Sequence, residues 1–261
     1  NQLATIDDGF RIIASYPELK SKPIVIGESD PEGCAACQGP QLQYRNSTMY
    51  SSYTAASFAR KHDLADRHGV NLEGALTWAF EFEDTPFFAG FRALATNGIN
   101  LPVSNVFRMF SRMAAERIPA PSDNALDLDT IVKQGVREKP DVGALASRDA
   151  RRATVLAWHY HDDDVPGPAA DISLAVEGLG LKQGKAKLQH FRIDGEHSNA
   201  YTVWQGMGSP PKPSAAQQAQ MEKASELAML PGHSGVDVAD GRAMIRFTLP
   251  RQGVSLIVLE W

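Results

Sequence analysis

The stretch Pro23-Ile24-Val25-Ile26-Gly27-Glu28-Ser29-Asp30 decides the fold class. Its β-branched residues stop abruptly at Gly27, which is typical of a strand buried on both faces in a parallel sheet. In α/β barrels, catalytic side chains project from the carboxyl ends of such strands. Glu28 is therefore a candidate catalytic carboxylate. The alternative is a strand-end glutamate that pairs with a nearby arginine.

The segments around this stretch alternate between helix and strand. Hydrophobic periodicity predicts helices over 6–16, 47–68 and 102–117, and a second strand over 72–80. This alternation is typical of an α/β fold. A polar loop over 29–46 follows the first strand, and loops of this length are often functional.

The second half of the chain has a different pattern. A polar stretch with two prolines, at 118–123, marks a domain boundary. Beyond it the sequence predicts one helix, at 214–229, among several short strands, which suggests a β-sandwich. Those strands are expected at 154–160, 171–176, 188–193, 242–249 and 254–259. We therefore predict two domains, residues 1–117 and 118–261.

The charge and hydropathy of the chain argue against two classes of partner, nucleic acids and membranes. A net charge of −5 argues against a nucleic-acid partner. No apolar run is long enough to span a bilayer, so no membrane partner is expected. The sequence has no signal peptide but begins with Asn1 rather than Met, so we expect a processed or partial chain and leave its compartment open.

Two motifs raise the possibility of a metal site. Cys34 and Cys37 form a lone C-x-x-C in a Pro/Gly-rich loop, without the further ligands that zinc needs. A free thiol pair and a local disulfide both remain open. His159 and His161 precede three aspartates, and a strand that runs into a solvated turn explains this better than a metal site does. We expect neither a metal ion nor a cofactor.

Acidic and aromatic residues also follow the second predicted strand. A retaining glycosidase needs two carboxyl groups about 5–5.5 Å apart, one as nucleophile and one as acid/base. Glu28 suits the nucleophile by position, and Glu81 or Glu83 could supply a partner. Trp78 and Phe80 could form an apolar wall for a sugar ring, although core packing is the simpler explanation for Trp78.

Motifs spread over nearly the whole chain follow one order. Ile26-Gly27-Glu28-Ser29-Asp30-Pro31 is followed by Leu76-Thr77-Trp78-Ala79-Phe80 and Phe88-Ala89-Gly90-Phe91. The most specific part runs from Phe191 through His197-Ser198-Asn199-Ala200-Tyr201 to Gly208-Ser209-Pro210. Together these motifs resemble glycoside hydrolase family 39, which contains the β-xylosidases and α-L-iduronidase.

The resemblance implies a fold and roles for particular residues. It implies the last part of a (β/α)8 TIM barrel, with strands seven and eight, followed by a β-sandwich accessory domain. Glu28 would be the nucleophile, and Trp78 and Phe80 would line the sugar site. Asp30 would contact the sugar or buttress Glu28, and Glu81 and Glu83 are further candidates for substrate binding.

Two departures from the family pattern shape the functional expectation. Glu28-Ser29-Asp30-Pro31 is closer to the iduronidase branch, which leaves the sugar open. A barrel of this kind takes about 250 residues, and the chain lacks the Asn-Glu dipeptide that carries the family's acid/base. We expect the C-terminal part of a retaining β-xylosidase that acts on short xylo-oligosaccharides. Its partner would be the remaining N-terminal barrel segment. The alternatives are another specificity in the family or a non-catalytic, carbohydrate-binding fragment.

Overall fold

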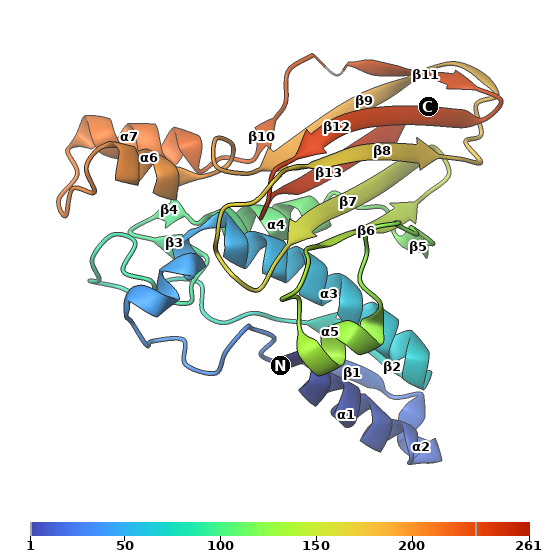
Figure 1. The fold of residues 1–261 in the computed structure, drawn as a ribbon, viewed down its shortest axis with the longest axis horizontal. Helices are drawn as coiled ribbons and strands as arrows, with labels where there is room; N and C mark the ends of the chain where they lie inside the picture. Colours follow the sequence, from blue (N-terminus) through green and yellow to red (C-terminus); the bar gives the residue numbers. More distant parts are fainter. Residues whose placement is uncertain (1, 233) are drawn as a thin grey trace.

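One long helix, α3 (Thr48–His68), lies between the two main parts of the molecule (Figure 1). The computed structural model describes residues 2–232 and 234–261. Helix α3 contacts strands of the large antiparallel sheet on one side and the N-terminal elements on the other. The other helices are α1 (Gln2–Ala14), α2 (Pro17–Lys20), α4 (Pro102–Phe110), α5 (Leu128–Gln134), α6 (Ala200–Gly206) and α7 (Ala215–Ala224), with a 3-10 helix over Pro40–Asn46.

Local signals in the sequence explain where α3 begins and ends. The Ser47 side chain accepts a hydrogen bond from the backbone N–H of Met49, which caps the first turn. At the other end Gly69 adopts φ 62° and ψ 37°, the left-handed conformation that a glycine reaches without steric cost. The predicted helix over 47–68 is therefore confirmed.

The N-terminal part contains a parallel pair of strands, β1 (Pro23–Ile26) and β2 (Asn71–Ala75). The prediction that β1 is buried on both faces is wrong. Ile24 and Ile26 pack against the core, but Val25 on the opposite face is 55% exposed. Among the described residues only one strand pairs with β1, and nothing covers its second face. Two parallel strands do not make a barrel, so the TIM barrel stays a prediction.

Three predicted elements are shorter in the structure than expected. The helix expected over 214–229 ends at Ala224, because residues 228–229 pair with residues 191–192 of the large sheet. The second strand ends at Ala75, because Ala79 and Phe80 bond instead to the backbone of Arg92, Leu94 and Ala95. The peptide bond between Trp78 and Ala79, in the same segment, is cis. Helix α4 ends at Phe110 rather than residue 117, since residues 116–118 form an edge strand of the large sheet.

The second half forms one antiparallel sheet that curls over on itself (Figure 1). Strand β9 is the point of the curl, because it pairs with β13 along residues 187–193 and with β11 along residues 183–187. The β-sandwich expected from the sequence is confirmed in part, because the described strands form a sandwich-like half-barrel made of this one curled sheet. They are β5 (Glu116–Ile118), β6 (Asp141–Arg148), β7 (Arg152–Tyr160), β8 (Ala170–Val176), β9 (Gln183–Ile193), β10 (Ala228–Met229), β11 (Gly235–Ala239), β12 (Arg242–Leu249) and β13 (Val254–Glu260). A small ribbon, β3 (Ala95–Thr96) with β4 (Ile99–Asn100), lies outside it.

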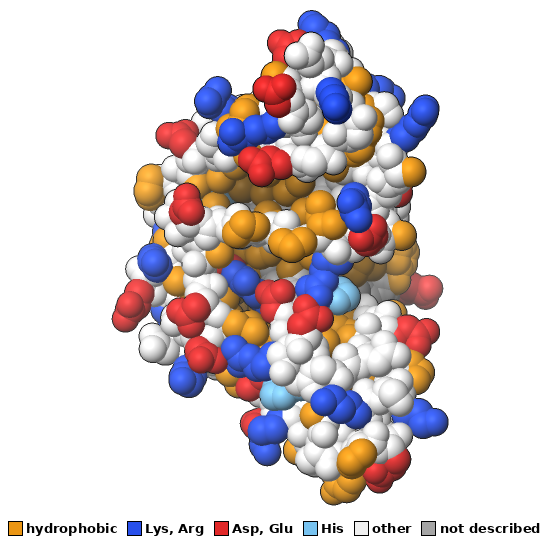
Figure 2. All heavy atoms as spheres, turned by 90° about the vertical axis from the view of Figure 1, so that its right-hand side faces the viewer, with side chains coloured by type: hydrophobic (Ala, Val, Ile, Leu, Met, Phe, Trp, Pro, Cys, Tyr) orange, Lys and Arg blue, Asp and Glu red, His pale blue; other side chains and the backbone are white. Residues whose placement is uncertain are grey.

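The central strands of this sheet are buried on both faces. In β13, Leu256 packs toward the helices, whereas Ile257 and Leu259 pack inside the curl. The space-filling view shows a hollow lined by hydrophobic side chains at one end of the molecule (Figure 2). No helix among the described residues is both long and apolar enough to cross a membrane.

A single hydrophobic core joins the two halves of the chain. It contains Phe10 and Leu64 from the N-terminal elements together with Trp158 and Leu256 from the sheet. The Trp158 ring lies across Gly143 of the neighbouring strand, where a Cβ atom would be 2.6 Å from Cζ2 of the ring. The division into domains at 117/118 remains a prediction, and this core crosses it.

Lys61 of α3 has a buried amino group whose protonation makes the stability of the fold depend on pH. Its amino group donates to Ser57 at 2.7 Å and lies 4.2 Å from the centre of the Phe58 ring. Burial lowers the pKa of Lys61 to about 7, an effect that the negative charge of Asp30 partly opposes. Between about pH 7 and 10.5 the unfolded chain therefore binds a proton that the folded chain does not, so stability rises with pH over this window.

Replacing Lys61 by methionine is expected to remove this pH dependence. Lys61→Met should raise the free energy of unfolding at pH 6 by about 2–4 kcal/mol, because the folded state no longer holds a buried charge. Thermal unfolding at pH 6 and pH 9 measures the effect, with the exposed Lys185→Met as control. Parallel pH profiles for Lys61→Met and the unmodified chain would contradict the expectation.

Candidate active site

Glu28 follows β1 directly, at the carboxyl end of the strand. Its side chain is 51% exposed, and Oε1 forms an ion pair with the guanidinium of Arg92. The pairing with an arginine, one of the alternatives for Glu28, is therefore observed, and the catalytic role stays a prediction for a carboxylate that is accessible from solvent. An accessible carboxylate that is held in one orientation suits a nucleophile.

Asp30 lies behind Glu28 and is 6% exposed. Its carboxylate accepts hydrogen bonds from the hydroxyls of Thr77 and Tyr50, the latter at 3.0 Å, and from the backbone N–H of Trp78 at 3.3 Å. Burial raises the pKa of Asp30, and these hydrogen bonds oppose the rise. Of the two expected roles, this burial and bonding favour the buttress over a direct sugar contact.

Aromatic side chains form an exposed shelf beside these carboxylates. Trp78 is 52% and Phe80 is 66% exposed, so neither is a core residue. Trp78 packs edge-on against Phe82 with centroids 5.8 Å apart, and Phe82 stacks on Phe91 at 4.7 Å. Flat apolar faces open to solvent are surfaces on which sugar rings can stack.

The acidic residues after the second strand lie apart from Glu28. Glu81 Oε1 accepts the backbone N–H of Gly98 at 2.8 Å and so stabilises a turn. Glu83 is exposed. Among the described residues, no hydrogen bond or ion pair links either one to Glu28, Asp30 or Arg92. Their proposed substrate contacts remain untested.

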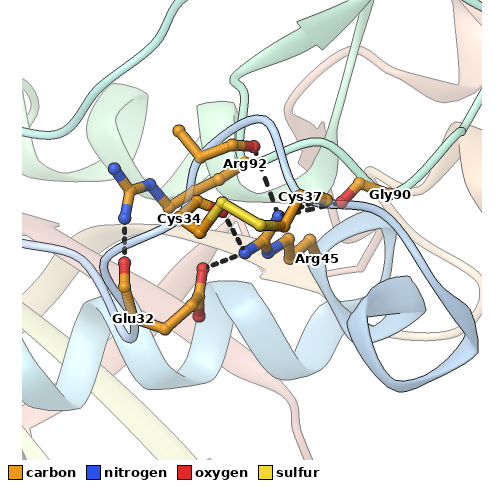
Figure 3. Close-up of a disulfide and its surroundings, with 7 residues drawn as sticks. Glu32, Cys34, Cys37, Arg45, Gly90 and Arg92 are labelled. Carbon is orange, nitrogen blue, oxygen red and sulfur yellow. Dashed lines mark hydrogen bonds and ion pairs between the residues drawn. A yellow bond between two sulfur atoms is a disulfide. The ribbon is translucent and has the colours of Figure 1, made fainter.

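Cys34 and Cys37 form a disulfide, which selects one of the two alternatives left open by the sequence. The Arg45 side chain is fully buried and lies against the turn that the disulfide closes (Figure 3). It donates to the carbonyls of Cys34 at 2.8 Å, Cys37 at 3.0 Å and Gly90 at 3.1 Å, and pairs with the Glu32 carboxylate at 2.5 Å. The loop after Glu28 is thus held in one conformation by the disulfide and by the hydrogen bonds of Arg45.

Sequence reasoning missed Arg92. It considered Arg45 either as a residue that hydrogen-bonds sugar hydroxyls or as part of a solvated helix start, and the second alternative is wrong, because Arg45 is buried and bonded to loop carbonyls. Arg92 is 1% and Arg45 is 0% exposed, and both bind residues of the loop that follows β1. A signal was present in Gly90-Phe91-Arg92-Ala93-Leu94, where a charge stands in an apolar segment. Reading it as a site residue requires the tertiary contact with Glu28, 64 positions away.

The two histidines considered for a metal site have structural roles. Nδ1 of His159 lies 3.1 Å from the carbonyl of Leu249, and Nε2 of His161 lies 2.9 Å from the carbonyl of Arg137. Within residues 2–232 and 234–261, no group of three or more His, Cys, Asp or Glu side chains is arranged to hold a metal ion.

A separate groove of about 1160 Å³ opens between α3, the 162–165 turn and α6. Its lining includes Tyr44, Tyr53 and Tyr160, but none of Glu28, Asp30, Arg92 or Trp78. The groove is therefore not the space above the candidate nucleophile.

An accessible carboxylate thus stands at the end of β1, paired with a buried arginine that also donates to the carbonyl of the exposed Trp78. Comparison with known proteins gives the class of protein. Residues 4–234 match the sequence profile of glycosyl hydrolases family 39. The chain belongs to that family.

Solved structures share the fold at low sequence identity. A monomeric β-xylosidase from Caulobacter crescentus CB15 is 20% identical with a TM-score of 0.70, and the family 39 enzyme from Xanthomonas axonopodis pv. citri is 19% identical with the same score. A bacterial orthologue of human α-L-iduronidase also gives 19% and 0.70. No curated protein matches.

These alignments cover 98% of this chain but only 48%, 48% and 44% of the three relatives. The chain thus spans less than half the length of these three solved structures.

Proposed function

We propose that this chain is the C-terminal portion of a retaining glycosidase with Glu28 as the nucleophile. The observation that carries the proposal is the half-exposed carboxylate at the end of β1, paired with a buried arginine that also donates to the carbonyl of the exposed Trp78. Phe80, also exposed, is proposed as a further sugar contact. Membership of family 39 supports hydrolysis of a glycosidic bond.

We propose a β-xyloside as the substrate, released as xylose from short xylo-oligosaccharides. The β-xylosidase among the similar structures supports this choice. The iduronidase orthologue, similar to the same extent, and the Glu28-Ser29-Asp30-Pro31 motif keep an iduronide as the second candidate.

The acid/base belongs, in this proposal, to an N-terminal segment that completes the barrel around β1 and β2. Relatives about twice as long support the existence of such a segment. The exposed apolar side chains of Val25 and Leu76 support it too, because water-exposed apolar surface of this kind is usually covered by a partner.

The reaction would proceed by double displacement and needs no cofactor. One oxygen of Glu28 attacks the anomeric carbon, the bond from that carbon to the leaving oxygen breaks, and the acid on the other segment protonates the leaving group. The acid/base residue on the other segment then activates a water molecule, which cleaves the glycosyl ester and restores the free carboxylate of Glu28.

Trapping of the ester tests the role of Glu28. The longer protein is incubated with 2,4-dinitrophenyl 2-deoxy-2-fluoro-β-D-xyloside, whose leaving group departs without protonation. We expect a peptide containing Glu28 to gain one fluoroxylosyl unit by mass spectrometry. A label on another residue would refute the assignment. Labelling only by the corresponding iduronide would replace xylose by the second candidate, and no label from either would favour a non-catalytic, carbohydrate-binding role.

A further inference from the structure

The guanidinium of Arg92 lies at the centre of the candidate site. Its Nε donates to the carbonyl of Trp78 at 2.9 Å, one terminal nitrogen donates to the carbonyl of Glu32, and the other pairs with Glu28 Oε1. Nε also lies 3.5 Å from Asp30 Oδ2. One side chain therefore joins the proposed nucleophile, its buttress and the aromatic shelf.

The backbone of Arg92 is fixed as firmly as its side chain. Its N–H donates to the carbonyl of Ala35, inside the disulfide turn, at 3.0 Å, and its carbonyl accepts the N–H of Ala79 at 3.2 Å. Arg45 holds the other side of that turn (Figure 3). The guanidinium thus projects toward Glu28 from a rigid frame, which limits the movement of both partners.

The positive charge of Arg92 bears on the ionisation of the carboxylates beside it. Arg92 is 1% exposed, and an arginine stays protonated at any pH at which the protein folds. Burial lowers the pKa of Arg92. Asp30 is buried beside it, whereas Glu28 is exposed on its other side, so the buried cation favours the ionised form of Glu28.

The two oxygens of Glu28 differ in their surroundings. Oε1 is engaged by Arg92, and within the described residues no hydrogen bond involves Oε2. With one oxygen held and the other open to solvent, the carboxylate presents a single oxygen for attack.

We propose that Arg92 is a positioning residue that keeps Glu28 ionised and oriented for attack on the anomeric carbon. This inference rests on the proposed function of Glu28. Arg92 itself does not need to contact the substrate.

Kinetics of Arg92 variants in the longer protein test the proposal, with 4-nitrophenyl β-D-xyloside as substrate. Arg92→Met should lower kcat about 10²-fold, since a small misplacement of a reacting group has an effect of this size. The acidic limb of the kcat/KM profile should move up by about one pH unit, because Glu28 loses its neighbouring positive charge. Arg92→Lys keeps the positive charge but not the planar guanidinium with its several N–H donors. It should therefore retain the position of the acidic limb while losing part of kcat.

Arg192→Met is the matched control, because Arg192 is also buried and ion-paired, to Asp194 at 3.2 Å in the sheet. It should lower the thermal midpoint without moving the pH profile. A normal kcat and pH profile in Arg92→Met, or the same shift in Arg192→Met, would overturn the proposal. Glu28→Ala separates this failure from a failure of the proposed function: an active Glu28→Ala refutes the nucleophile, whereas an inactive Glu28→Ala beside a normal Arg92→Met refutes only the positioning role.

Discussion

Glu28→Ala is expected to lower kcat/KM for an aryl xyloside by about 10⁴- to 10⁶-fold in the longer protein, the scale seen when a catalytic nucleophile is removed. The reason is that no other group described beside Arg92 is both a carboxylate and exposed, since Asp30 is buried. Steady-state kinetics with the purified variant measure the effect. Glu73→Ala, an exposed glutamate in β2, is the control and should change kcat/KM by less than about threefold.

Azide distinguishes a lost nucleophile from a damaged fold. In Glu28→Gly the space left by the side chain admits azide, which attacks the anomeric carbon in place of the carboxylate. We expect azide to restore cleavage of a dinitrophenyl xyloside and to give the α-xylosyl azide. Wild-type activity in Glu28→Ala, or rescue that gives no xylosyl azide, would remove Glu28 from the role proposed for it.

Asp141→Ala is expected to have the largest effect on stability. Asp141 is 1% exposed and accepts three hydrogen bonds, each of 2.8 Å: from Arg60 of α3, from the backbone N–H of Leu126 and from Nε1 of Trp158. Its loss leaves a largely buried arginine and two buried N–H groups without this acceptor. Breaking a buried pair in this way costs about 3–5 kcal/mol.

Thermal unfolding measures this loss as a fall in midpoint of about 10 °C, since about 1 kcal/mol corresponds to 2–4 °C in a chain of this size. Asp141→Asn keeps two of the accepting positions but not the charge, so it should fall between Asp141→Ala and the unmodified chain. The exposed Asp149→Ala should stay within about 0.5 kcal/mol of the unmodified chain. Equal midpoints for Asp141→Ala and Asp149→Ala would show that the three hydrogen bonds contribute little.

Elements that depend on local signals could be predicted from the sequence. Caps at Ser47 and Gly69 bound α3. Alternating residues define β12, a continuous apolar run defines β13, and the turn at residues 250–253 separates them. Strand β6 was missed because Gly143 and the small residues beside it are weak strand formers, and the contact with Trp158 that requires the glycine is non-local. The curl of the sheet was missed because β9 changes partner along its length.

The candidate site divides in the same way. Glu28 directly follows a strand that a pattern can locate, whereas Trp78 and Phe80 lie beyond the observed end of the second strand, in a segment that the pattern assigned to the strand itself. Arg92, which pairs with Glu28, lies in an irregular segment, and Arg45, which holds the loop after Glu28, ends a short 3-10 helix. At both places charged residues are normally solvated. The roles of the two arginines depend on contacts with carbonyls and carboxylates brought together only by the folded chain.

The core shared by α3 and the sheet constrains how relatives of this chain can be recombined. Because Leu64, Trp158 and Leu256 pack in one cluster, an exchange at the 118–123 proline stretch would pair a foreign sheet with this helix. Such a chimera should fold poorly unless the α3 face and the sheet face come from the same parent. Over evolutionary time the α3 face and the sheet face are then expected to change together. Recombination that separates α3 from the sheet should therefore be rare among related proteins.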